Sequence, residues 1–99
     1  MREKAFTLVK DAIAELNEEL EYDTLREVGE DTPIYGGDEG IDSLSLVTLI
    51  VNLEERSESA FGRRLALADQ KAMSMRNSPY RTAGALADFI VARLGEADG

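Results

Sequence analysis

The chain contains neither cysteine nor histidine among its 99 residues. Without cysteine it has no disulfide, no thiol nucleophile of its own and no cysteine-ligated metal site. Without histidine it lacks the commonest general base and a frequent metal ligand, and a Ser-His-acid triad is excluded. Carboxylates remain, but no pair of them lies at a spacing that suggests a carboxylate hydrolase. We therefore expect that the chain is not an enzyme and that it binds no metal.

Long hydrophobic runs are also missing. No apolar stretch approaches the roughly 20 residues that a membrane-spanning helix needs. The N-terminal segment is interrupted by Lys10 and Asp11, so it lacks the continuous apolar region of a secretory signal. These absences predict a cytoplasmic protein that does not insert into a membrane.

Acidic side chains outnumber basic ones, 20 to 11, for a net charge of −9. Residues 1–60 carry 16 acidic and 5 basic side chains, whereas residues 61–99 carry 4 and 6. An acidic surface disfavours nucleic acid and anionic membranes as partners. Such a surface often serves solubility alone. Its uneven distribution favours a protein partner that has a basic docking patch, and we expect the chain itself to be a monomer.

Helical periodicity dominates the sequence. Apolar residues recur at helical spacing over 2–20, 44–56 and 82–94, and a short helix is expected over 69–75. No alternating pattern predicts a strand. The sequence therefore predicts an all-α fold, a small four-helix bundle with three long helices and one short one. We expect one domain over 1–95, with Gly95 ending the last helix and 96–99 forming a flexible tail.

A long first loop, residues 21–42, separates the first two helices. Proline and glycine within it predict turns, and a short helical turn is expected near 24–28. We expect the loop to be pinned to the bundle by four apolar side chains: Leu25, Val28, Ile34 and Tyr35. A loop of this length in a small domain suggests a function.

The segment that follows, residues 40–55, organises the chain. Either Asp42 or Ser43 can cap a helix that starts here. Seven of the ten residues from 44 to 53 are large and apolar. One apolar stripe should face the core, namely Leu46, Leu49, Ile50 and Leu53. A second stripe, which we call the outer stripe, consists of Leu44, Val47 and Val51. Spacing alone favours burial of both stripes.

The sequence Gly-Ile-Asp-Ser-Leu at 40–44, followed by an apolar helix that ends at 53–55, resembles the attachment site of acyl carrier proteins. The run Thr-Ala-Gly-Ala-Leu-Ala-Asp-Phe-Ile at 82–90 is similar to the last helix of that family. The resemblance covers nearly the whole chain and is to the discrete bacterial type. It implies that Ser43 carries 4′-phosphopantetheine, taken from coenzyme A by a phosphopantetheinyl transferase with Mg²⁺. It also implies that Asp42 helps to orient the transferase site.

The resemblance has further implications for partners. The outer stripe would be exposed and would dock partner enzymes, with Glu54 and Glu55 as acidic support. Those partners are the transferase, an acyl- or aminoacyl-loading ligase and acyl-transferring enzymes of lipid biosynthesis (fatty acids) or secondary metabolism (polyketides). Ser45 and Thr48 stand where fatty-acid carriers have acidic residues, which favours a specialised carrier. The alternative function is an unmodified helical adaptor that binds partners through the outer stripe.

Overall fold

The computed structural model describes residues 2–36, 40–62, 65–68 and 79–98, and the side chains of these residues except those of 96–98. Three α-helices are present in this part of the chain: α1 (Arg2–Leu20), α2 (Ser43–Phe61) and α4 (Ala83–Asp98). A single 3₁₀ turn, η1 (Asp23–Leu25), follows α1. The described residues form isolated bridges but no strand. The all-α prediction is confirmed, whereas the short helix expected at 69–75 lies outside the described residues.

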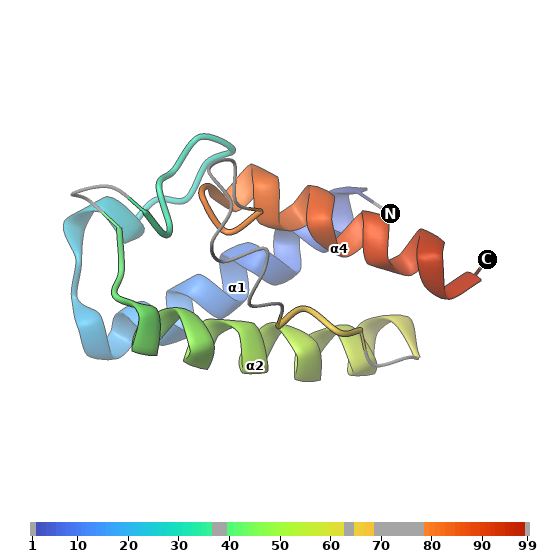
Figure 1. Cartoon of the computed structure of the whole chain (residues 1–99). Coiled ribbons are helices and arrows are strands. Elements are labelled where there is room, and N and C mark those ends of the chain that lie inside the picture. Colours follow the sequence, from blue (N-terminus) through green and yellow to red (C-terminus); the bar gives the residue numbers. More distant parts are fainter. Residues whose placement is uncertain (1, 37–39, 63–64, 69–78, 99) are drawn as a thin grey trace.

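The first helix, α1, is the centre of the arrangement. It packs against both α2 and α4, and in Figure 1 it runs antiparallel to them and lies between them, farther from the viewer. No Cα atom of α2 lies within 8 Å of a Cα atom of α4. The two outer helices are therefore held together through α1 and through the segments that connect them.

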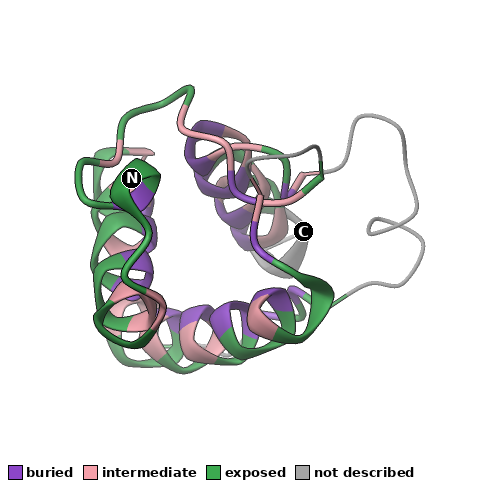
Figure 2. Cartoon of the chain, turned by 90° about the vertical axis from the view of Figure 1, so that its left-hand side faces the viewer, coloured by how far each residue is buried: buried purple, intermediate pink, exposed green. Residues whose placement is uncertain are grey.

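The core lies on the inward faces of the three helices, as the buried residues in Figure 2 show. All four residues of the predicted inner stripe of α2 are at most 1% exposed, so that prediction is confirmed. The loop residues Leu25 and Ile34 are buried, while Val28 and Tyr35 are half-buried against the core. The long loop is therefore pinned as predicted. Burying each large apolar side chain stabilises the fold by about 1.5–3 kcal/mol.

Residues 65–68, which lie between α2 and α4 in sequence, contact both α2 and the residues just before α4. Leu65 and Leu67 are buried, and the Leu67 N–H donates to Glu54 Oε2 at 2.9 Å. The Tyr80 hydroxyl donates to the Leu67 carbonyl at 2.5 Å. Tyr80 is fully buried, and its ring packs edge to face against that of Phe89, with 5.8 Å between the ring centroids. These contacts link α2 to the residues just before α4.

The predicted end of α2 was wrong. The helix continues through the polar residues 57–59 to Phe61, because Ser57 faces the core and is fully buried. It ends at Gly62, which has a φ of 76° and whose N–H donates to the Glu58 carbonyl at 3.0 Å. A positive φ of this kind favours glycine, so Gly62 is the residue that ends the helix.

The predicted end of α4 was also wrong. Thr82 caps this helix, and its Oγ1 accepts a hydrogen bond from the Ala85 N–H at 3.1 Å. The helix then passes through Gly95 and reaches Asp98. The described glycines with positive φ are Gly36 and Gly62, so Gly95 retains the helical conformation. Glycine lowers helix stability but does not by itself end a helix.

The long loop is fastened to the start of α4 by backbone hydrogen bonds. Gly84 N–H donates to the Glu30 carbonyl at 2.9 Å, and Ala83 N–H donates to the Thr32 carbonyl at 3.1 Å. A Cβ atom at position 84 would lie only 2.8 Å from the Glu30 carbonyl oxygen. Gly84 therefore permits the close approach of loop and helix. This anchor fixes the path of the chain toward α2.

Candidate functional site

Asp42 is the N-cap residue of α2. Its backbone is extended, with φ −77° and ψ 171°, and its Oδ1 accepts from the Ser45 N–H at 2.7 Å. The sequence allowed either Asp42 or Ser43 to be the N-cap, and in the structure the cap is Asp42. Hydrogen bonds from the Ser45 N–H, and then from the Ser45 side chain, hold the pKa of Asp42 below its ordinary value. The carboxylate is therefore charged at neutral pH.

Ser43 is the first residue of α2, and its side chain is exposed. Because Asp42 supplies the cap, the Ser43 hydroxyl is not needed to start the helix. It lies at the positive end of the helix dipole, where several backbone N–H groups have no partner within the helix. An anion attached to this hydroxyl would be stabilised by that end of the helix.

The loop before Ser43 is closed tightly. Ile41 is buried, and its N–H donates to the Ile34 carbonyl at 2.7 Å. A Cβ atom at Gly40 would lie 3.0 Å from the Gly36 nitrogen and 3.1 Å from the Ile34 carbonyl oxygen. Gly36 itself has a φ of 89°. The positive φ of Gly36 favours glycine, and a side chain at Gly40 would require the neighbouring backbone to shift by a few tenths of an ångström.

The outer stripe is exposed. Leu44, Val47 and Val51 are 76%, 48% and 42% exposed, respectively. The prediction of burial that spacing alone favoured is wrong, and the exposure implied by the resemblance is confirmed. α2 buries its inner stripe against the bundle, and the outer stripe lies on another side of the same helix.

The two acidic residues beyond the outer stripe differ in their surroundings. Glu55 is exposed, whereas Glu54 is half-buried and accepts the Leu67 N–H described above. Sequence reasoning treated the two as equivalent and missed this structural contact. It also gave no role to Tyr80, which is fully buried. The only sequence signal for Tyr80 is that it is one of six aromatic residues, a class that is usually buried.

A second group of polar residues joins α1 to α2. Glu15 Oε2 accepts from Asn52 Nδ2 at 3.0 Å and pairs with the Arg56 guanidinium. The hydrogen bond from Asn52, and then that from Arg56, lower the pKa of Glu15. Arg56 Nε also donates to Asn52 Oδ1 at 2.5 Å. The three side chains tie the two helices together on their solvent side.

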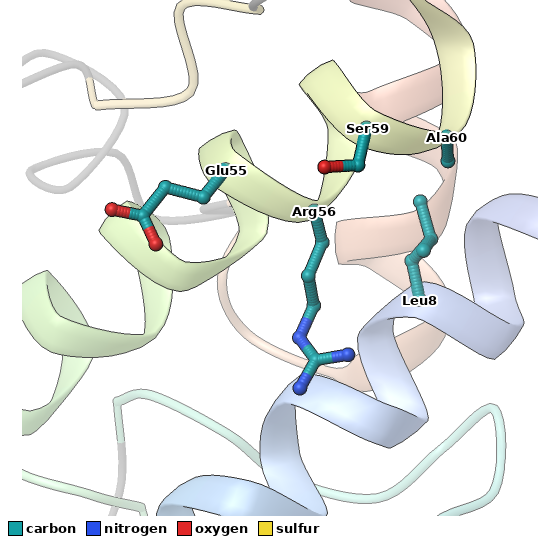
Figure 3. A pocket seen from close by; sticks show the side chains of 5 residues that line it. All are labelled: Leu8, Glu55, Arg56, Ser59 and Ala60. Carbon is teal, nitrogen blue, oxygen red and sulfur yellow. The ribbon is translucent and has the colours of Figure 1, made fainter.

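Near this group lies an open groove of about 430 Å³ between α1 and α2. Figure 3 shows Arg56 extending from α2 toward α1 beside Leu8, while Glu55 points away from them. The groove begins 12 residues beyond Ser43, which is about 18 Å along the helix. It is therefore separate from Ser43, whose surroundings are an exposed surface.

Comparison of the chain with protein-family models, with curated proteins and with solved structures finds no match. In the part of the chain that the structure describes, no helix is long and apolar enough to cross a bilayer. The same residues contain no cluster of three acidic side chains that could hold a metal ion.

Proposed function

We propose that this chain is a carrier protein that bears 4′-phosphopantetheine on Ser43. In this proposal it is not itself a catalyst. It holds acyl, or alternatively aminoacyl, groups as thioesters and presents them to enzymes of lipid or secondary-metabolite biosynthesis in the cytoplasm. The observation that carries the proposal is the exposed Ser43 hydroxyl at the start of α2, directly after the Asp42 cap and within the Gly-Ile-Asp-Ser-Leu motif.

The residues around Ser43 fit the group. In the transfer, Ser43 Oγ would form a bond to phosphorus, its proton would be lost, and the nucleotide part of coenzyme A would leave. The resulting phosphodiester anion would lie next to the first-turn N–H groups of α2. When attached, the group supplies the thiol that the sequence lacks. Because Ser43 is exposed, the arm would extend from the protein surface toward partner enzymes.

Intact-mass measurement tests this proposal. The wild-type chain is incubated with coenzyme A, Mg²⁺ and each of several phosphopantetheinyl transferases of broad specificity. We expect the mass to increase by one phosphopantetheine. Ser43→Ala should show no increase, whereas Ser59→Ala, which removes another exposed serine of α2, should be modified like the wild type. An unmodified wild type, or a modified Ser43→Ala, would contradict the proposal.

The exposed outer stripe favours one alternative, an unmodified helical adaptor. Leu44, Val47 and Val51 could bind a partner without any group on Ser43. In that case no transferase would change the mass of the chain, and Ser43 would be an ordinary first residue of a helix. Ser43→Ala would then leave function intact.

A further inference from the structure

Residues 29–33 of the long loop, which we call the strap, cross the start of α4. The carbonyls of Glu30 and Thr32 accept hydrogen bonds from the N–H groups of Gly84 and Ala83, at 2.9 and 3.1 Å. Those two N–H groups belong to the first turn of α4, so they have no partner within the helix itself. The strap therefore satisfies donors that α4 cannot satisfy alone.

The side chains of the strap add little to its attachment. Residues 29–31 are exposed, and Thr32 and Pro33 are only half-buried. The buried anchors of the loop lie on either side of the strap, at Leu25 and Ile34. Segments with few buried apolar side chains and accessible backbone hydrogen bonds open locally at a lower free energy than the whole fold. The strap can therefore lift from α4 while both anchors stay in the core.

Arg2 ties the strap, α1 and α4 together. Its Nη2 donates to Glu30 Oε1 of the strap at 2.6 Å, and its Nε donates to Asp88 Oδ1 of α4 at 2.7 Å. Its guanidinium also lies 5.5 Å from the centroid of the Phe6 ring. Arg2 is the first residue of α1, where the helix dipole disfavours a positive charge. The two carboxylates offset that unfavourable interaction and hold the guanidinium against the strap.

The ion pairs of Arg2 are open to solvent. The side chains of Arg2, Glu30 and Asp88 are 36%, 59% and 72% exposed. Exposed ion pairs are weak, and dissolved salt screens them. We infer that Arg2 is an electrostatic clasp that keeps the strap on α4, and that rising ionic strength opens the strap while the helices stay folded. This conformational device is independent of the proposed carrier function.

Amide hydrogen exchange of single residues, followed by NMR, tests the inference at about 25 mM and about 500 mM NaCl. The Gly84 and Ala83 amides report on the strap, because their acceptors lie in it. The Leu86 amide is the control for α4, since it donates to the Thr82 carbonyl at 3.0 Å. The Ile41 amide, which donates to the Ile34 carbonyl, is the control for the path to α2.

In the wild type we expect the Gly84 and Ala83 amides to exchange about threefold faster at high salt, with Leu86 and Ile41 unchanged. Arg2→Gln should raise the exchange rate of Gly84 and Ala83 about fivefold at low salt and abolish most of their response to salt. Arg2→Lys keeps the charge but not the fork of donors that reaches both carboxylates, so it should give an intermediate rate.

Arg26→Gln is the matched control variant. Arg26 is also an exposed arginine of an ion pair, but its partner is the nearby Asp23, at 3.1 Å. Arg26→Gln should leave the Gly84 and Ala83 amides unchanged. The inference is overturned if Arg2→Gln leaves these two amides unchanged, or if Arg26→Gln accelerates them equally. Equal acceleration of Leu86 or Ile41 by Arg2→Gln also overturns it, because the opening would then extend beyond the strap.

Discussion

Asp42 combines two roles at the scale of a single residue. It starts α2 through its hydrogen bond to the Ser45 N–H, and it stands directly before the hydroxyl proposed to be modified. The capping role explains why an acidic residue is favoured here without any appeal to a partner. The two roles can be separated experimentally, because stability reports only the first.

Asp42→Asn tests the charge of the cap. The pKa of Asp42 is lower in the folded chain than in the unfolded chain. The charged carboxylate therefore stabilises the fold at pH values above its unfolded pKa, and this stabilisation is lost as the pH falls through its folded pKa. We expect Asp42→Asn to unfold at lower urea concentration than the wild type at neutral pH. The difference should shrink steadily as the pH falls below about 4. A difference that stays constant from pH 7 to pH 3 would show that the charge has no part in it.

Ser57, unlike Asp42, is a polar residue at a buried position where an apolar side chain would fit. Its hydroxyl is fully buried and has no hydrogen-bond partner among the described residues. Ser57→Ala should raise the free energy of unfolding by about 1 kcal/mol, because it removes an unpaired buried hydroxyl. Ser59→Ala, on the exposed side of the same helix, isolates the smaller gain in helix propensity. Equal effects of the two changes in urea unfolding would mean that the Ser57 hydroxyl is paired.

Among the structural elements, the segment around Leu67 holds α2 to the start of α4. Glu54→Ala leaves the Leu67 N–H without this acceptor and should lower the free energy of unfolding by about 1–3 kcal/mol. Glu55→Ala is the matched control, since it changes the same residue type one position along the helix at an exposed site. Thermal unfolding of both variants measures the difference. If both lose the same stability, the Leu67 contact is not significant.

Two glycines of α4 have opposite surroundings. A Cβ atom at Gly84 meets the backbone of Glu30, whereas one at Gly95 meets nothing within 4 Å. Gly84→Ala should therefore lower the free energy of unfolding by about 1–3 kcal/mol through overpacking. Gly95→Ala should raise it by up to about 1 kcal/mol, because alanine is the better helix former. Urea unfolding of the two variants checks both signs, and a stabilised Gly84→Ala would show that the loop can move away.

The elements that sequence predicted best are those determined by their own side chains. Periodicity correctly placed α1 over residues 2–20 and identified the inner stripe of α2. The predicted end of α2 was wrong because a tertiary contact, the burial of Ser57, continues the helix through polar residues. The predicted end of α4 was wrong because glycine does not by itself end a helix. In the candidate site, a helix cap at 42–43 followed from the sequence. The engagement of Glu54 did not, because its partner lies 13 residues away in an irregular segment.

At the scale of the whole molecule, the spacing of apolar residues in the sequence could not predict the central position of α1. Apolar stripes show that helices pack, but not which pairs of helices meet. Here the first helix contacts both others, whereas no Cα atom of α2 lies within 8 Å of a Cα atom of α4.

The same arrangement has a consequence for how the chain folds. Arg2 of α1 pairs with Asp88 of α4, 86 residues away along the chain. During synthesis, α1 emerges first, yet one of its faces stays uncovered until α4 has been made. Contacts so distant in sequence slow folding, because a large loop must close before they form. We therefore expect a nascent chain that ends before α4 to expose apolar surface and to depend on the ribosome or a chaperone for protection.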